Sequence, residues 1–294
     1  MSEYGLLFLM DKNTCGAKER RWERPMQKSR IPSYNYAEHV SDSQNFLTKR
    51  QLIRKILNLS SITKEDTVLE IGAGKGHLTE ALCEKSGYVY SVEIDQKLYE
   101  STSVKLSQCT NLKLILGDFL KYSLPGQGSY KVFANIPFFI TTQIIDKLTN
   151  ASNPPSEAWL VMEKGAARRF AGFPKENKRS LLLKVGWETE VVYHFRREDF
   201  HPMPCVDSVL LHLKKKETPD LSKKEALSFQ KFIEHSMRHG LSGKQGLLTQ
   251  KQVSTALKCA GLPPAYRDGV TLYIQWLCLF RCYLCFNGSG RRGN

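Results

Sequence analysis

The strongest constraint on the fold is a glycine-rich turn between an apolar run and a helix. Residues 67–71 form a short apolar segment, and Gly72, Gly74 and Gly76 follow it at alternate positions. Glycine accepts backbone conformations with positive φ and lets a ligand approach where a Cβ would block it. A strand, this turn and a helix over about 75–85 are typical of an α/β sheet whose carboxyl edge binds a nucleotide-like molecule.

The segments that follow repeat this alternation of strand and helix. Strands are predicted at 67–71, 88–93, 112–116, 131–134 and 159–162, and helices at 48–59, 75–85, 96–106 and from about 141. Thr48 is the expected N-cap of the first helix. Strands that alternate with helices predict a parallel, doubly wound sheet. Two further strands, 190–195 and 208–213, have no clear helix between them and are expected to form an antiparallel pair at one edge.

Three regions are predicted from composition and charge. Residues 1–34 hold an Arg-rich run that we interpret as a mobile basic arm, either touching RNA or simply solvated. Residues 35–216 form the predicted Rossmann-like domain, and residues 217–294 a small helical domain with helices near 222–239, 249–260 and 270–285. The net charge is +14, and the last 77 residues carry 11 basic against 4 acidic side chains. This balance favours a polyanionic partner.

The cysteines and the apolar segments bear on the cellular compartment. The chain has eight cysteines, no recognisable signal peptide, and an apolar run at 270–286 that is shorter than a membrane span requires. We expect free thiols, a cytoplasmic protein and no association with a membrane. Cys278, Cys282 and Cys285 have the C-x-x-x-C-x-x-C spacing of radical enzymes with an iron–sulfur cluster. Because the motif ends an apolar helix, we interpret these residues as buried free cysteines and expect no metal.

Two classes of cofactor compete for the glycine-rich turn. A dinucleotide site requires G-x-G-x-x-G, but His77 occupies the position of the last glycine. Sites for S-adenosylmethionine use a looser G-x-G-x-G and place an acidic residue shortly before it, which Glu70 supplies. The turn therefore favours S-adenosylmethionine, with Gly72 and Gly74 as contacts.

The ends of the next two strands support this choice. Glu93 ends the second strand, where a carboxylate can accept hydrogen bonds from both ribose hydroxyls of a nucleoside. Asp118 follows the third strand and can accept from an adenine amino group. Ile94 or Phe119 can cover the adenine ring.

The fourth strand ends in Asn135-Ile136-Pro137-Phe138, and this turn carries the predicted chemistry. An adenine amino nitrogen is a poor nucleophile because its lone pair is delocalised into the ring. The Asn135 side-chain oxygen and the Ile136 carbonyl can accept its two N–H groups. Pro137 holds the turn, and Phe138 offers a face for an extruded base. A sulfonium methyl donor needs no strong base, so catalysis is positioning and electrostatics.

With these motifs the chain closely resembles the Erm family of 23S rRNA adenine N6-methyltransferases, from about residue 43 to the C-terminus. The shared motifs are Ser43-Gln44-Asn45-Phe46-Leu47, Glu70 to Gly76, Val92-Glu93-Ile94-Asp95, Gly117-Asp118, Asn135 to Phe138, and Phe200 to Ser208. The resemblance implies cofactor contacts at Asn45, Leu47, Gly72, Glu93, Asp118 and Asn135. The chain departs from the family at Phe138, where Tyr is usual, and near Ala166, where an aromatic residue is frequent. The change at Phe138 leaves the choice between one and two methyl additions open, and the change near Ala166 implies a thinner clamp on the base.

The resemblance also implies the substrate and its consequence. Methylation of one adenine near the peptidyl-transferase centre of 23S rRNA, before the ribosome is fully assembled, would confer resistance to macrolides, lincosamides and streptogramin B. We expect a monomer that contacts RNA through the basic residues after the fifth strand: Lys164, Arg168, Arg169, Lys178 and Arg179.

Two alternatives remain at this stage. A dimethyladenosine transferase of small-subunit rRNA shares the chemistry but usually has Leu and Tyr in the catalytic turn. A non-catalytic nucleic-acid binder on the same fold, like the related mitochondrial transcription factors, would not need the complete cofactor pattern found here.

Overall fold

The computed structural model describes residues 45–265 and 272–289. The predicted arm at residues 1–34 lies outside these residues, as do Ser43 and Gln44 of the first shared motif. Within the described residues, no helix is long and apolar enough to cross a membrane.

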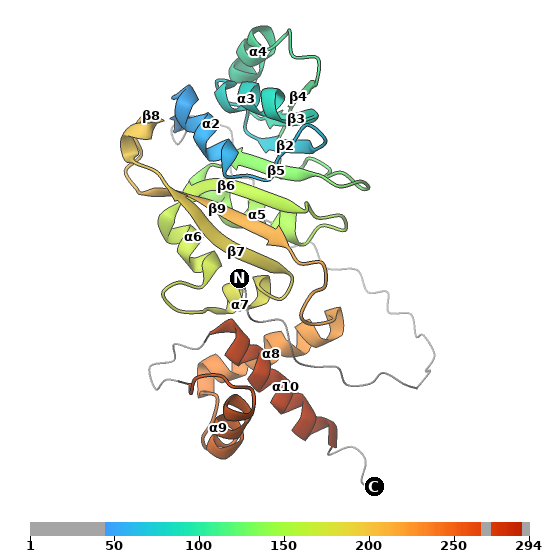
Figure 1. Cartoon of the computed structure of the whole chain (residues 1–294), viewed down its shortest axis with the longest axis vertical. Helices are drawn as coiled ribbons and strands as arrows, with labels where there is room; N and C mark the ends of the chain where they lie inside the picture. Colours follow the sequence, from blue (N-terminus) through green and yellow to red (C-terminus); the bar gives the residue numbers. More distant parts are fainter. Residues whose placement is uncertain (1–44, 266–271, 290–294) are drawn as a thin grey trace. The chain divides into compact units, whose positions relative to one another are not determined.

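A seven-stranded sheet forms the centre of the fold (Figure 1). Its strands lie in the order β4-β3-β2-β5-β6-β9-β7. Their bounds are β4 (Leu112–Leu116), β3 (Tyr88–Glu93), β2 (Thr67–Ile71), β5 (Lys131–Asn135), β6 (Glu157–Glu163), β9 (Ser208–Lys215) and β7 (Trp187–His194). All neighbours pair in parallel from β4 to β6, whereas β9 is antiparallel to both β6 and β7. The Rossmann-like, mostly parallel sheet and the antiparallel pair at one edge are confirmed. The strand that runs against the others is β9, one position inside the edge strand β7.

Helices cover both faces of this sheet because the buried side chains alternate along its strands. In β5, Val132 and Ala134 belong to the core under α5 (Thr141–Thr149) and α6 (Lys164–Ala171). Phe133 faces the opposite core, under α2 (Arg50–Asn58) and α3 (His77–Lys85). This two-sided burial fits the nearly continuous apolar pattern of parallel strands.

Some helix boundaries differ from those predicted. The N-cap of α2 is Lys49, without a side-chain hydrogen bond, so the expected cap at Thr48 is wrong. α3 begins at His77 rather than Lys75 because its N-cap, Gly76, is left-handed with φ +73°. The sequence prediction had no helix at α6 or at α7 (Lys178–Leu183), which lie between β6 and β7. α4 (Gln96–Lys105) and the short η1 (Phe138–Ile140) and η2 (Arg197–Asp199) complete this part of the chain.

The strand order creates a crevice at the carboxyl edge of the sheet. From β2 the chain moves outward through β3 to β4, and then returns to place β5 on the other side of β2. At such a switch point the connections leave in opposite directions, and ligands bind outside the strand ends. A separate two-stranded ladder pairs β1 (Phe46–Leu47) with β8 (Phe200–His201).

The C-terminal helices are α8 (Lys223–His239), α9 (Gln250–Cys259) and α10 (Tyr273–Ser289). Capping boxes start α8 at Ser222 and α9 at Thr249. Their apolar side chains form one core that includes Leu181 of α7. The boundary at residue 217 stays a prediction.

The cysteines of α10 differ from expectation. Seven cysteines lie in the described residues and all are free. Cys278 and Cys282 are half-buried, but Cys285 is exposed, so the expectation of three buried thiols is wrong for it. The core of the C-terminal helices takes in Cys278 and Cys282 but does not reach as far along α10 as Cys285.

Candidate active site

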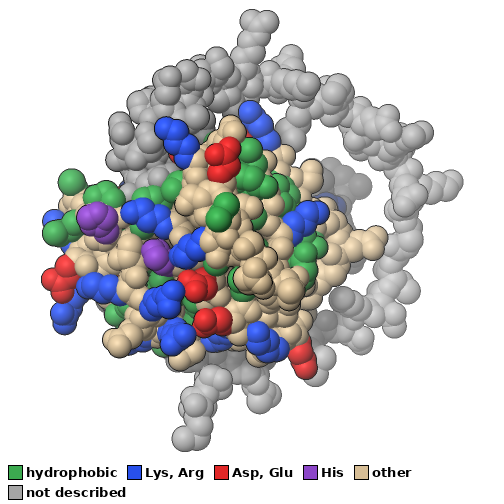
Figure 2. Space-filling view, turned by 90° about the horizontal axis from the view of Figure 1, so that it is seen from above, with side chains coloured by type: hydrophobic (Ala, Val, Ile, Leu, Met, Phe, Trp, Pro, Cys, Tyr) green, Lys and Arg blue, Asp and Glu red, His purple; other side chains and the backbone are tan. Residues whose placement is uncertain are grey.

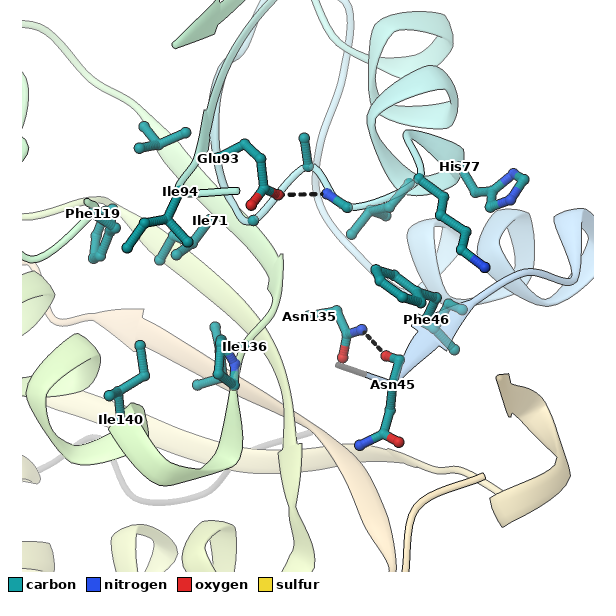
Figure 3. Close-up of a pocket in the computed structure, with 18 of the residues that line it drawn as sticks. Asn45, Phe46, Ile71, His77, Glu93, Ile94, Phe119, Asn135, Ile136 and Ile140 are labelled. Atoms are coloured by element: carbon teal, nitrogen blue, oxygen red, sulfur yellow. Dashed lines mark hydrogen bonds between the residues drawn. The ribbon is translucent and has the colours of Figure 1, made fainter. Parts of the chain in front are cut away.

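A pocket opens at the switch point, where the ends of β2, β3, β4 and β5 meet β1 (Figure 3). It holds about 970 Å³ of space, including its open mouth. The structure brings together every residue predicted to bind the cofactor or act in catalysis. These are Asn45, Leu47, Gly72, Gly74, Glu93, Ile94, Asp118, Phe119, Asn135, Ile136 and Phe138.

Two glycines leave room in the floor of this pocket. Gly72 has φ +80° and its N–H donates to the Val92 carbonyl at 2.8 Å. Gly117 directly follows β4, and its N–H donates to the Glu93 carbonyl at 2.8 Å. A Cβ built at either position would meet no atom within 4 Å. Both positions therefore border open space that a side chain would occupy.

Gly74 has a different reason to be glycine. Its φ is +54°, and a Cβ there would lie 2.8 Å from the ring of Phe46. Phe46 belongs to β1, which packs directly against the turn, and the Lys75 ammonium lies 4.9 Å from the centre of the same ring. The turn and β1 are thus packed together by an aromatic ring.

Glu93 is fixed by the backbone on both sides. One carboxylate oxygen accepts from the Gly74 N–H at 2.8 Å (Figure 3). The other accepts from the Asp95 N–H at 2.9 Å. The side chain is only 2% exposed, and burial raises the pKa of its carboxyl while these backbone hydrogen bonds oppose the rise. Each oxygen keeps a second lone pair, so the carboxylate can still accept from a ligand.

Glu70 lies behind the turn and does not line the pocket. One of its carboxylate oxygens accepts from the hydroxyls of Thr79 on α3 and Ser91 on β3, at 2.7 and 2.5 Å. The other oxygen is buried and, among the described residues, has no hydrogen-bond partner. Complete burial raises the pKa of this carboxyl to about 7, with a smaller contribution from the charge of Glu93. Glu70 therefore connects α3 to the sheet beneath the turn.

The end of β4 provides the third predicted contact. Asp118 accepts from the Leu120 N–H at 2.8 Å, and its other oxygen is 3.9 Å from the Lys121 ammonium. Phe119 is buried in the core and also lines the pocket, and the Lys147 ammonium lies 5.2 Å from its ring centre. These contacts fix the loop that carries both predicted groups.

Asn135 ends β5, and its side-chain amide has a defined orientation. The amide nitrogen donates to the backbone carbonyl of Asn45 at 2.7 Å (Figure 3). Because a carbonyl can only accept, the nitrogen must face Asn45, and the amide oxygen is the group left for the pocket. The Asn45 side chain points away from Asn135 in Figure 3.

The residues that follow Asn135 form a turn that leads into η1. The Ile136 N–H donates to the Val161 carbonyl at 3.1 Å, which continues the pairing of β5 with β6 by one residue. Pro137 has φ −62° and ψ 129° and precedes η1, where Phe138 begins the helical turn. Phe138 is half-buried and lines the pocket, whereas Phe139 beside it is 45% exposed.

The residues that line the pocket but were not predicted as contacts include Phe46, Lys75 and His77. Lys75 lies in the glycine-rich turn and His77 directly after it. Their position beside Gly74 and Gly76 could therefore have indicated that they line the pocket. Burial lowers the pKa of His77, and the charge of Lys105 adds to this effect. Nothing in the sequence around Phe46 indicated that β1 would pair with β8.

The predicted RNA contacts lie outside this pocket, on α6 and α7. Lys164 and Arg168 line a second, shallow groove with Arg197 and Asp207. Asp207 is 3.1 Å from Arg197 and 3.9 Å from Lys164. Lys178 pairs with Glu234 and Arg179 with Asp146. Arg169 is exposed.

Figure 2 shows the end of the molecule that carries α4, where Lys and Arg side chains are also numerous and acidic ones fewer.

The described residues contain no cluster of metal-binding side chains. Among residues 45–265 and 272–289, no three His, Cys, Asp or Glu side chains are placed so that they could hold a metal ion.

Comparisons with known proteins place this arrangement among RNA-modifying enzymes. The sequence profile of the family described as "Ribosomal RNA adenine dimethylase" matches residues 35–255. An rRNA adenine N-6-methyltransferase of Lysinibacillus sphaericus is 35% identical over 250 residues, which cover 85% of this chain and 98% of that protein. One of Limosilactobacillus reuteri is 34% identical, with the same coverage.

Solved structures agree with this similarity. The crystal structure of the 23S rRNA methyltransferase ErmE is 28% identical, with a TM-score of 0.72 over 81% of this chain and 99% of that one. A dimethyladenosine transferase from Plasmodium falciparum shares the fold, with a TM-score of 0.65 at 22% identity over 83% of this chain and 98% of that one.

Proposed function

The chain belongs to the ribosomal RNA adenine dimethylase family, and we propose that it transfers a methyl group from S-adenosylmethionine to N6 of one adenine in 23S rRNA. The observation that carries this proposal is the orientation of the Asn135 amide. Its nitrogen is occupied by the Asn45 carbonyl at 2.7 Å, so the pocket receives an oxygen acceptor at the end of β5. An amino group is the natural partner of such an acceptor.

The residues around the pocket fit an adenosine-containing cofactor. The open floor at Gly72 and Gly117 admits a ligand close to the backbone, and the Glu93 carboxylate lies between these two strand ends. We assign the ribose hydroxyls to Glu93, the adenine amino group to Asp118, and the two faces of the adenine to Ile94 and Phe119. Asn45 and Leu47 complete the site from β1. When bound, S-adenosylmethionine supplies an electrophilic methyl group on a positively charged sulfur.

The protein's contribution to the reaction is to orient and polarise the target nitrogen. In the proposed complex, the Asn135 side-chain oxygen and the Ile136 carbonyl accept the two N–H groups of the target adenine. Two acceptors draw the nitrogen toward tetrahedral geometry and free its lone pair from the ring. Phe138 stacks on the extruded base and holds it in line for attack. Both acceptors are weak bases, so they do not remove a proton before transfer.

The choice of 23S rRNA rests on similarity rather than on the pocket itself. ErmE is named a 23S rRNA methyltransferase and is 28% identical to this chain. Methylation of an adenine near the peptidyl-transferase centre would block macrolides, lincosamides and streptogramin B. We assign the protein to the cytoplasm as a monomer that acts before the ribosome is fully assembled, with Lys164, Arg168, Arg169, Lys178 and Arg179 along the RNA. Residues 35–216 and 217–294 are the proposed catalytic and helical domains.

The test is transfer of a labelled methyl group to purified 23S and 16S rRNA, each stripped of ribosomal proteins. Mass spectrometry of the digested RNA should find N6-methyladenosine or N6,N6-dimethyladenosine in 23S rRNA alone. Expression in a macrolide-sensitive bacterium should raise the inhibitory concentration of erythromycin, and Asn135→Ala should not. Methylation of 16S rRNA instead would identify a small-subunit dimethyladenosine transferase. Binding of the cofactor without transfer to either RNA would identify a non-catalytic nucleic-acid binder.

A further inference from the structure

An aromatic side chain stands exposed at the end of α6. Gly172 ends this helix in the left-handed conformation, with φ +73°. The next residue, Phe173, is 60% exposed, although its N–H donates to the Arg168 carbonyl at 2.9 Å. The backbone of Phe173 is therefore tied to the helix end while its ring stays in solvent.

Arg168 lies against one face of this ring. The central carbon of its guanidinium is 5.4 Å from the centre of the Phe173 ring. A ring that is mostly exposed and carries a guanidinium on one face has its other face available to a second planar group. Arginine and aromatic side chains together are a common arrangement for stacking unpaired bases.

Arg168 has no acidic partner among the described residues, and neither does Arg169 beside it, whereas four other cations of this region do. Lys164 and Arg197 approach Asp207, Lys178 pairs with Glu234, and Arg179 pairs with Asp146. Among the residues that the structure describes, Arg168 has no ion pair, although it lines the same groove as Lys164 and Arg197. Its N–H donors are therefore open to a phosphate.

We propose that Phe173 is a stacking platform for an unpaired RNA nucleobase, and that Arg168 binds the adjoining phosphodiester. This inference rests on the proposed function, because it assigns a second contact to the same RNA. The stacked nucleotide is not the target adenine, because Phe173 does not line the pocket that contains Asn135. A single ring with a guanidinium on one face suits a nucleotide better than an apolar protein partner, which would bury a larger hydrophobic patch.

Tryptophan fluorescence provides a direct readout of stacking. Phe173→Trp keeps a flat ring at this position, and the other tryptophans that the structure describes, Trp159, Trp187 and Trp276, are buried. We expect single-stranded oligoadenylate to quench the emission of this variant relative to wild type. A duplex RNA of the same length, whose bases are already paired and stacked, should leave it unchanged. Equal quenching by both RNAs, or by neither, would overturn the proposal.

Kinetics provides the second measurement. Phe173→Ala should raise KM for 23S rRNA by about tenfold, the usual effect of losing one stacked base, with kcat at saturating RNA and the dissociation constant of the cofactor unchanged. Phe173→Trp should restore the wild-type KM. The matched control is Phe286→Ala on α10, whose ring is 57% exposed and should have no effect.

The outcomes separate this inference from the proposed function. If wild type methylates 23S rRNA and Phe173→Ala has an unchanged KM, the stacking platform is wrong and the function stands. If wild type methylates no rRNA, the proposed function is wrong. Binding of a second protein molecule at the Phe173 ring, in place of RNA, can be detected separately. The emission of the Phe173→Trp variant can be measured without RNA at increasing protein concentration. A change in this emission would indicate self-association through the ring and overturn the proposal.

Discussion

The Asn135 side-chain nitrogen donates to the Asn45 carbonyl at 2.7 Å, across ninety positions of sequence. This bond selects one of the two orientations that an asparagine amide can adopt. The amide oxygen then belongs to the pocket, and the group that orients it is a backbone atom of the segment leading into β1. The proposed acceptor therefore depends on two parts of the chain at once.

Replacement of Asn135 tests this acceptor. Asn135→Ala would remove one of the two proposed hydrogen bonds to the target nitrogen, and kcat should fall on the order of 10²-fold or more. The dissociation constant of S-adenosylmethionine, measured by calorimetry, should change little. Asn150→Ala is the control, because Asn150 is exposed after α5 and away from the pocket. Near-normal turnover of Asn135→Ala would refute the proposed mechanism.

Glu93→Gln should weaken cofactor binding without unfolding the protein. The glutamine amide keeps one oxygen acceptor but presents an NH2 group where the carboxylate now accepts from the Gly74 or Asp95 N–H. We expect the dissociation constant to rise at least about tenfold, which corresponds to about 1.4 kcal/mol. Glu100→Gln, at an exposed position on α4, should bind normally. An unchanged constant for Glu93→Gln would remove this carboxylate from the cofactor site.

Glu70 should make stability depend on pH. Its pKa is raised from 4.5 to about 7 in the folded protein, chiefly by burial, so the folded protein retains a proton that the unfolded chain releases. The stabilisation is complete below about pH 4.5 and is lost as pH rises through 7. Glu70→Gln stays neutral and can still accept from Thr79 and Ser91. The free energy of unfolding of wild type relative to this variant should fall between pH 5 and 8, on the order of 3 kcal/mol. A pH-independent difference in chemical denaturation would contradict the assignment.

Arg169 offers a test of the RNA surface through salt. If this exposed guanidinium neutralises one phosphate, Arg169→Ala should lower the slope of log affinity against log salt concentration by about 0.7–0.9. Fluorescence anisotropy with a labelled 23S rRNA fragment, titrated between low and moderate salt, measures this slope. Lys223→Ala, at the start of α8, is the charge-matched control and should leave it unchanged. An equal slope for wild type and Arg169→Ala would place Arg169 away from the backbone of the RNA.

The sheet could be predicted because its signals are local. The runs at 67–71, 88–93 and 112–116 alternate with turns and helices, and the structure has strands at these same residues. Once the strands were predicted, the residues around the pocket could be predicted too, because parallel strands place their carboxyl ends at a common edge. Glu93, Asp118 and Asn135 were identifiable from their position after a strand rather than from their residue type alone.

The parts that escaped prediction have no such local signal. The buried face of α6 consists of Ala166, Ala167 and Phe170, and small alanines give little hydrophobic contrast beside the basic residues. The acceptor for the Asn135 amide is a backbone carbonyl, which every residue has. Phe46 reaches the glycine-rich turn only because β1 pairs with a segment more than 150 positions later.

The pairing of β1 with β8 also determines how late in synthesis the site can finish folding. In the described residues, β1 has no other strand partner, and its two rungs join Phe46 to His201 and Leu47 to Phe200. A nascent chain that has completed β2 to β6 therefore still lacks the ladder that holds the neighbour of Asn45 in place. Two-thirds of the polypeptide must leave the ribosome before the amide at the end of β5 acquires its final direction.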